Sequence, residues 1–153
     1  MSTDMHTLDA TLEERIDEAF GEITDDIARV DARAGELLAE HDAITWEADA
    51  STFAFSHVSR SAEAVLGYPV ERWTGEPTFW ADVVVHHADR DEAVSFCVAE
   101  TGQCRDHAFE YRAKAVDGKV VRLRDYVRVI PDAAGRPSRL RGIMIVVPAG
   151  RVF

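Results

Sequence analysis

Residues 117 and 118 are an Asp-Gly pair that separates two segments, 108–116 and 120–130, in which apolar and polar residues alternate. This dipeptide is a strong signal for a two-residue β-hairpin turn, because glycine accepts the positive φ that such turns require. A third apolar segment, 140–147, follows a stretch of turn-forming residues that contains two prolines and a glycine. The C-terminal part of the chain is therefore predicted to form three antiparallel strands.

The part of the chain between residues 43 and 102 combines strand and helix signals. Residues 43–47 and 53–58 have the composition of two short strands, and 59–84 read as short helical turns. A longer helix is predicted from Asp89 to residue 101, since Asp89 and Glu92 have capping-box spacing. Two strands, several helices and three further strands predict an α+β fold with one antiparallel sheet.

The N-terminal residues 8–41 contain no proline and carry apolar side chains at alternating spacings of four and three. This pattern predicts one long amphipathic helix with a heptad seam of about three repeats. The seam would support a homodimer through a coiled coil, or it would dock on the chain's own sheet, and the pattern leaves both readings open. The candidate dimerisation residues are Ile16, Phe20, Ile23, Ile27, Val30 and Leu37.

Charge divides the chain near Asp42. Residues 1–42 hold 13 Asp or Glu against three arginines, while the remaining residues are almost neutral. The formal net charge of the whole chain is -11. An acidic segment repels phosphate, so nucleic acid and anionic membrane are not expected partners. The domains expected are an acidic helical segment at 1–42, a globular domain at 43–148 and a short tail at 149–153.

The location expected is the cytoplasm. No apolar run approaches the roughly 20 residues that span a bilayer, and the first residues lack the order of a signal peptide. Cys97 and Cys104 are accordingly expected to be reduced thiols. Arginine outnumbers lysine 15 to 2, which points to a bacterial or archaeal source.

Several short motifs in one order give the chain a family resemblance across residues 43–147. They are Ile44-Thr45-Trp46-Glu47-Ala48-Asp49, Val58-Ser59, Ala64-Val65-Leu66-Gly67-Tyr68, Phe79-Trp80, His86 with Asp89-Arg90, Phe109-Glu110-Tyr111-Arg112, Asp117-Gly118 and Arg139-Leu140-Arg141-Gly142. In these the chain resembles the PAS domain family, in the subgroup common in bacterial sensor kinases and diguanylate cyclases. The resemblance implies a five-stranded antiparallel sheet that cups a small pocket, flanked by short helices, in a non-enzymatic sensor of signals for an effector protein or domain.

The sequence departs from this family pattern at two places. His87 stands where the family usually has proline, and the exit motif after the last strand is absent, since Val147 is followed by Pro148. That exit usually couples the sensor to its effector. The N-terminal helix is therefore expected to carry the signal.

Alternation along the predicted strands assigns one row of side chains to the pocket. Asp125 lies in this otherwise apolar row, where a carboxylate needs a hydrogen-bond partner or anchors a ligand. A small apolar ligand is expected among these residues; the alternative is that they fill a core and the chain acts only through protein contacts. The pocket candidates are Trp80, Val94, Cys97, Phe109, Tyr111, Leu123, Asp125 and Ile145.

Other chemistries receive less support from the sequence. The predicted helix at 89–101 contains no histidine, which argues against haem, and the Asn-Cys-Arg-Phe loop of covalent flavin photochemistry is missing. Noncovalent flavin and no cofactor both stay open. No metal is expected, because adjacent histidines such as His86 and His87 usually point apart. An isomerase or dehydratase that uses Asp125 with His107 or His86 is a further alternative, but no catalytic motif accompanies them.

Overall fold

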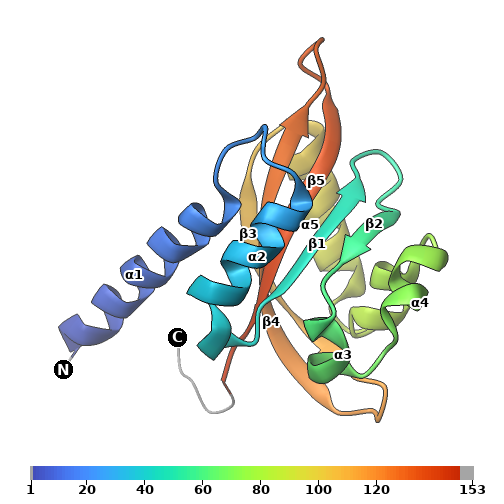
Figure 1. Ribbon diagram of the computed structural model, residues 1–153. Helices are drawn as coiled ribbons and strands as arrows, with labels where there is room; N and C mark the ends of the chain where they lie inside the picture. The colour runs from blue at the N-terminus through green and yellow to red at the C-terminus, as the bar shows by residue number, and fades with distance from the viewer. Residues whose placement is uncertain (1, 149–153) are drawn as a thin grey trace.

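A single five-stranded antiparallel sheet forms the centre of the molecule (Figure 1). The computed structural model describes the backbone of residues 2–148 and the side chains of residues 11–148; the expected tail at 149–153 lies outside the described residues. The strand order is β2-β1-β5-β4-β3. This confirms the predicted fold class. The strands are β1 (Ile44–Asp49), β2 (Phe55–Val58), β3 (His107–Lys114), β4 (Val120–Pro131) and β5 (Pro137–Val146).

The turn between β3 and β4 is one residue longer than predicted. The Ala115 amide donates to the Lys119 carbonyl at 2.8 Å, so three residues form the loop. Gly118 has a φ of +89°. Three-residue hairpin loops commonly have glycine in this left-handed conformation. The Asp-Gly pair therefore located the hairpin correctly but not its loop length.

Short helices cover the inner face of the sheet and enclose the main core (Figure 1). They pack Trp73, Phe79 and Trp80 against strand residues such as Leu123 and Met144. These elements are α3 (Ser61–Leu66), α4 (Val70–Gly75), the π-helical turn η2 (Trp80–Val84) and α5 (Arg90–Gly102).

Asp89 binds a strand instead of capping α5 through its side chain. Its carboxylate accepts hydrogen bonds from the Arg112 backbone amide at 2.8 Å and from the Arg112 guanidinium at 3.0 and 2.7 Å. Hydrogen bonds from the Arg112 side chain lower the pKa of Asp89 to about 2. The predicted capping box is wrong, and the residue instead joins α5 to β3.

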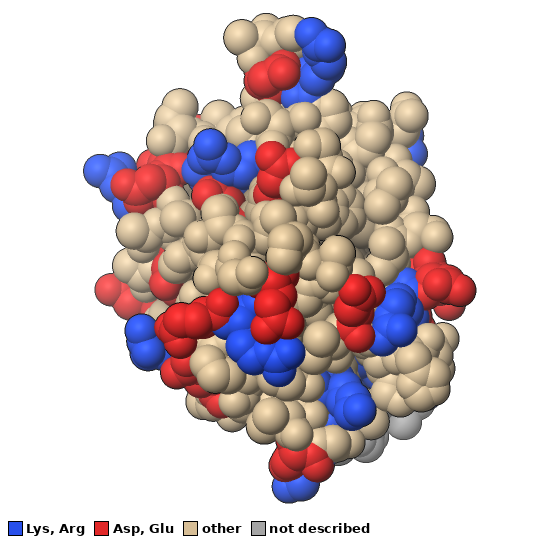
Figure 2. All heavy atoms as spheres, turned by 90° about the vertical axis from the view of Figure 1, so that its right-hand side faces the viewer, with Lys and Arg blue, Asp and Glu red and all other residues tan. Residues whose placement is uncertain are grey.

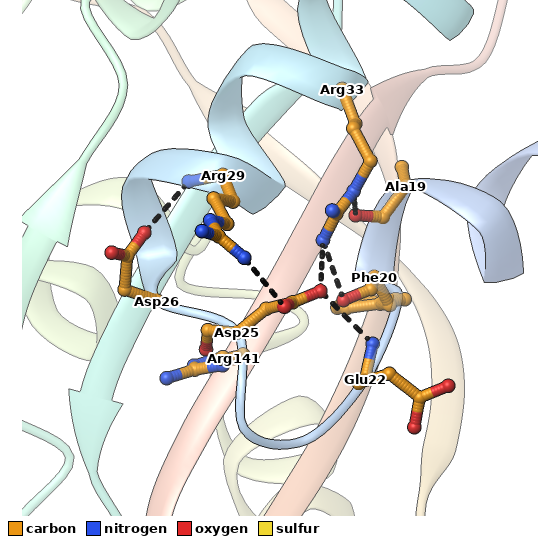
Figure 3. Close-up of polar contacts among 8 residues, drawn as sticks. All are labelled: Ala19, Phe20, Glu22, Asp25, Asp26, Arg29, Arg33 and Arg141. Atoms are coloured by element: carbon orange, nitrogen blue, oxygen red, sulfur yellow. Dashed lines mark hydrogen bonds and ion pairs between the residues drawn. The ribbon is translucent and has the colours of Figure 1, made fainter.

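The predicted single N-terminal helix is wrong as well, because two helices form there (Figure 3). α1 (Ser2–Phe20) ends at Gly21, which has a φ of +63°. Arg33 of α2 (Ile27–Leu37) donates to the carbonyls of Ala19 and Phe20 at 3.0 and 3.3 Å, so it satisfies the C-terminus of α1. The N-terminal segment is thus a helical hairpin.

This hairpin docks on the outer face of the sheet (Figure 1). Leu12, Ile16, Phe20 and Val30 are buried in a second core with Ile143 and Ile145 of β5, and the hairpin packs around them. Ile23 lies in the loop and is 55% exposed, while Ile27 and Leu37 are partly buried against this core. The heptad series therefore does not form one continuous seam, and three of its members, Ile16, Phe20 and Val30, are buried against the chain's own sheet.

A buried ion pair fastens the loop of the hairpin to the sheet. The Arg141 Nε donates to Glu47 Oε2 at 2.9 Å, and Arg141 Nη1 donates to the Asp25 carbonyl. Asp25 also accepts from Arg33 at 2.8 Å, so one loop residue connects the sheet to α2 (Figure 3). The hairpin is held by apolar packing along its length and by these polar contacts at its turn.

Asp26 begins α2, and its replacement by alanine tests the helix break. The Arg29 amide donates to Asp26 Oδ1 at 3.0 Å, an N-cap bond. Asp26→Ala is expected to lower the free energy of unfolding by about 1 kcal/mol in urea denaturation. Glu36→Ala, an exposed change inside α2, is the control and should change stability much less. Equal effects of both changes would contradict an N-cap at this position.

Candidate functional site

A fully buried carboxylate lies at the centre of the inner face of the sheet. Asp125 of β4 has 0% exposure; its Oδ1 accepts from Trp46 Nε1 at 3.0 Å, and its Oδ2 accepts from the Tyr111 hydroxyl at 2.8 Å. Trp80 Nε1 in turn donates to the Tyr111 hydroxyl at 3.0 Å. β1, η2, β3 and β4 each contribute one of these residues. Asp125, Tyr111, Trp46 and Trp80 are named the Asp125 cluster below.

The environment of Asp125 favours its neutral form. Burial raises the pKa of Asp125 to about 7, although the hydrogen bonds from Tyr111 and Trp46 act in the opposite direction. Among the described residues, no Lys, Arg or His forms an ion pair with this carboxylate. Burial also raises the pKa of Tyr111 well above its usual value. The cluster is therefore a buried titratable site for which the described residues provide no counter-ion.

Two hollows adjoin the Asp125 cluster. An interior cavity of about 10 Å³ is bounded by Trp46, Phe53, Trp80 and Asp125, and is close to the smallest volume that holds one water molecule. An open groove of about 420 Å³ lies between the β1–β2 loop, η2 and α5, and Phe53 and Trp80 also line it, together with Val94. These two aromatic side chains form the wall that the cavity and the groove share.

Most of the predicted pocket residues lie on this inner side. Cys97, Tyr111, Leu123 and Asp125 are buried there. The shared core also includes Trp80, Phe109 and Val94, of which Phe109 lines the cavity and Val94 the groove.

Ile145 is the exception, and its assignment to the pocket is wrong. Asp125 pairs with Met144 across β4 and β5, so Met144 shares the face of Asp125 and Ile145 points to the N-terminal hairpin. The last strand has apolar residues on both faces, and alternation of apolar and polar residues therefore could not fix its register.

Some residues of the site were not predicted from the sequence. Trp46 binds the carboxylate directly, and Phe53, Phe55 and Leu140 line the interior cavity. Trp46 lies in a predicted strand with apolar residues at alternate positions, which was the available signal.

Cys97 forms a hydrogen-bonded pair with His107 at the edge of the site. The Cys97 Sγ lies 3.2 Å from His107 Nε2, and His107 Nδ1 lies 2.9 Å from the Arg105 carbonyl. Burial raises the pKa of the Cys97 thiol to about 12, so the reactive thiolate is suppressed at neutral pH. The Cys97–His107 pair therefore joins α5 to β3 and does not supply a reactive thiolate.

The histidines do not form the acid-base machinery of the isomerase alternative. Among the described residues, Asp125 has Trp46 and Tyr111 as hydrogen-bond partners, and neither His107 nor His86 reaches it. The rings of His86 and His87 stack with centroids 4.3 Å apart, and the described side chains contain no group of three metal-ligating residues.

The surface of the molecule carries both signs of charge. On the face that Figure 2 shows, acidic and basic side chains are interspersed. This face therefore shows no basic stripe of the kind that attracts a phosphate backbone. In the part of the chain that the structure describes, no helix has the length and apolar character to cross a membrane.

Comparison with known proteins identifies the fold. The family model described as PAS fold matches residues 55–144. No curated protein matches the chain.

Three solved structures illustrate the likeness. The N-terminal domain of a diguanylate cyclase with PAS/PAC sensor from Marinobacter aquaeolei is 36% identical, with 68% of this chain and 94% of that chain covered and a TM-score of 0.62. A PAS domain from Colwellia psychrerythraea is 17% identical, with 80% and 98% covered and a TM-score of 0.61. A sensory box histidine kinase/response regulator from Burkholderia thailandensis is 19% identical, with 75% and 84% covered and a TM-score of 0.59. With more than half of its residues matched by the family model, this chain belongs to the PAS family.

Proposed function

We propose that the chain is a sensory module that binds a small, mainly apolar molecule at the Asp125 cluster and transmits this event through the sheet to the α1–α2 hairpin. PAS domains are sensory modules that commonly dimerise and signal to effector domains, and no catalytic constellation is assembled by the described residues. The observation that carries the proposal is the position of β5 between the two cores. Met144 packs in the inner core, while Ile143 and Ile145 pack in the outer one.

The interior supports the site of binding. Asp125 keeps acceptor capacity, because an ionised carboxylate has about four lone-pair directions and two are used. The groove of about 420 Å³ meets the interior at Phe53 and Trp80, so a ligand entering from the groove would displace these aromatic side chains. Apolar walls with a few polar groups are the usual composition of small-molecule sites.

The outer core supports the route of the signal. Asp125 pairs with Met144, and the residues on either side of Met144 are buried beneath the hairpin. A displacement of β5 caused by ligand at the inner face would therefore disturb the apolar contacts that hold α1 and α2. A close-packed sheet transmits such shifts, because it has little free volume to absorb them.

Dimerisation stays a prediction within this proposal. Ile16, Phe20 and Val30 are buried against the chain's own sheet, so their use in a dimer would require the hairpin to leave it. Ile23 in the exposed loop is free to contact a second copy without such a change.

A second candidate is an interaction module that binds no ligand. The interior cavity of about 10 Å³ favours it, since the aromatic side chains nearly fill the space. In that case the fold would act as a scaffold for protein contacts through the hairpin.

Native mass spectrometry of the purified protein, compared with its denatured mass, separates these candidates. We expect the native species to carry a noncovalent molecule whose loss on denaturation gives its mass, and the same spectrum gives the number of subunits. A native species without extra mass, unchanged after incubation with a library of small apolar compounds, would contradict ligand binding and support the interaction module.

A further inference from the structure

The Asp125 cluster places one buried carboxylate among several aromatic rings. The interior cavity is lined by the aromatic residues Trp46, Phe53, Phe55, Trp80 and Phe109, and Asp125 is the one carboxylate among its described lining residues. Aromatic faces attract cations through their quadrupole, and the attraction grows when water is excluded. A carboxylate surrounded by aromatic rings is complementary to a positively charged nitrogen.

When Asp125 is ionised, no described side chain compensates its charge. Its two partners are neutral donors, the Trp46 indole and the Tyr111 hydroxyl. An ionised carboxylate in a buried site is costly unless an opposite charge accompanies it. A cationic ligand would remove this cost, whereas an anionic ligand would be repelled.

The volumes of the cavity and the groove indicate a ligand with a small charged group and a longer apolar chain. The cavity beside Asp125 has about the volume of one water molecule, and an ammonium group is of similar size. The groove on the other side of Phe53 and Trp80 is apolar along Val94 and Val98 of α5. A linear chain attached to the ammonium group would lie in this groove after the shared aromatic wall moves.

We infer that the Asp125 cluster binds the ammonium group of a primary alkylamine, whose alkyl chain lies in the groove between the β1–β2 loop, η2 and α5. This inference rests on the proposed function and names the chemical class of its ligand. Among the described residues, the groups around Asp125 include the rings of Trp46, Trp80 and Tyr111 and the thiol of Cys97. None of them is a cation, so the ligand supplies the positive charge.

Protonation of Asp125 competes with this binding. Because burial raises the pKa of Asp125 to about 7, a proton occupies the carboxylate in part of the molecules at neutral pH. Affinity for an alkylammonium ion should therefore rise as the pH increases from 6 to 8, while the amine itself stays charged. A neutral alcohol of the same length should show no such pH dependence.

The test compares n-butylammonium, n-butanol and butyrate in titrations of tryptophan fluorescence and of thermal unfolding. We expect n-butylammonium to bind at least tenfold more tightly than the other two at pH 8. Asp125→Asn is expected to lower its affinity at least tenfold. Glu36→Gln, an equal change of net charge on the exposed side of α2, should leave the affinity unchanged.

Equal affinity for n-butanol, retention of n-butylammonium binding by Asp125→Asn, or no binding of n-butylammonium at pH 8 would each overturn the inference. Should native mass spectrometry then reveal a neutral ligand, the sensory function would stand without the amine. A native species without extra mass that also stays unchanged with the library of small apolar compounds would remove both. Thermal unfolding of Asp125→Asn without ligand shows whether the variant is folded.

Discussion

Gly142→Ala is expected to lower the free energy of unfolding by about 3 kcal/mol or more. A Cβ at position 142 would overlap the five- and six-membered rings of the Trp46 indole, well inside van der Waals contact. Overpacking of a buried site usually costs about 1–3 kcal/mol. Displacement of Trp46 would also remove its hydrogen bond to Asp125, which adds the cost of a buried acceptor without a partner. Urea denaturation followed by tryptophan fluorescence measures the change.

Gly35→Ala is the matched control for this substitution. Gly35 lies in α2, its Cβ would meet nothing within 4 Å, and its backbone is helical. Alanine is favoured over glycine by about 1 kcal/mol inside a helix, so this variant should be slightly more stable than the parent protein. If Gly142→Ala and Gly35→Ala both changed stability by less than about 0.5 kcal/mol, the close packing of Trp46 on β5 would be incorrect.

The stability of the protein is expected to fall by up to roughly 4 kcal/mol as the pH rises from about 4 to about 7, and Asp125→Asn should remove this part of the pH dependence. The pKa of Asp125 is raised to about 7 by burial, whereas an unfolded Asp titrates near its ordinary value. Between these values the folded state keeps a proton that the unfolded state has released. Rising pH therefore favours unfolding up to about pH 7 and has no further effect through this group.

Other carboxylates act in a different pH window. The pKa of Asp49 is lowered to about 2 by hydrogen bonds led by the Ser51 hydroxyl, and that of Asp89 is lowered to about 2 by Arg112. Their stabilisation is lost as the pH falls from about 4 to 2, in both the parent protein and the Asp125→Asn variant. The difference between the two urea-denaturation series, measured from pH 4 to 8, isolates Asp125. Glu36→Gln controls for the change in net charge, and parallel series for Asp125→Asn and the parent protein would show that Asp125 titrates normally.

The sheet could be predicted from the sequence because its strands carry local signals. β3 and β4 alternate on either side of a turn dipeptide, and the short strands before them are bounded by polar residues. The N-terminal hairpin could not be predicted in this way. Heptad spacing records that one face is apolar, but the break at Gly21 is stabilised by Arg33 of the next helix and by Asp25 of the connecting loop. A contact between residues of two helices does not change the apolar periodicity of the sequence.

The site was predictable where a single strand or helix determined which way its own residues face. Asp125 attracted attention as a charged residue in an apolar row, and Tyr111 followed from the same alternation on β3. Trp46 and Met144 required the pairing of β1 with β5 and of β5 with β4, which joins residues far apart in the sequence. Ile145 was assigned to the wrong face for the same reason.

The strand order has a consequence for how the chain assembles. β1 pairs with β5, and the outer core beneath the hairpin is completed by Ile143 and Ile145 of that last strand. The helices α1 and α2 are synthesised first, yet their docking surface exists only after β5 has joined the sheet. Contacts between distant segments form late because closing a long loop costs entropy. We therefore expect the hairpin to dock last in folding, and to be the layer that can leave while the sheet stays intact.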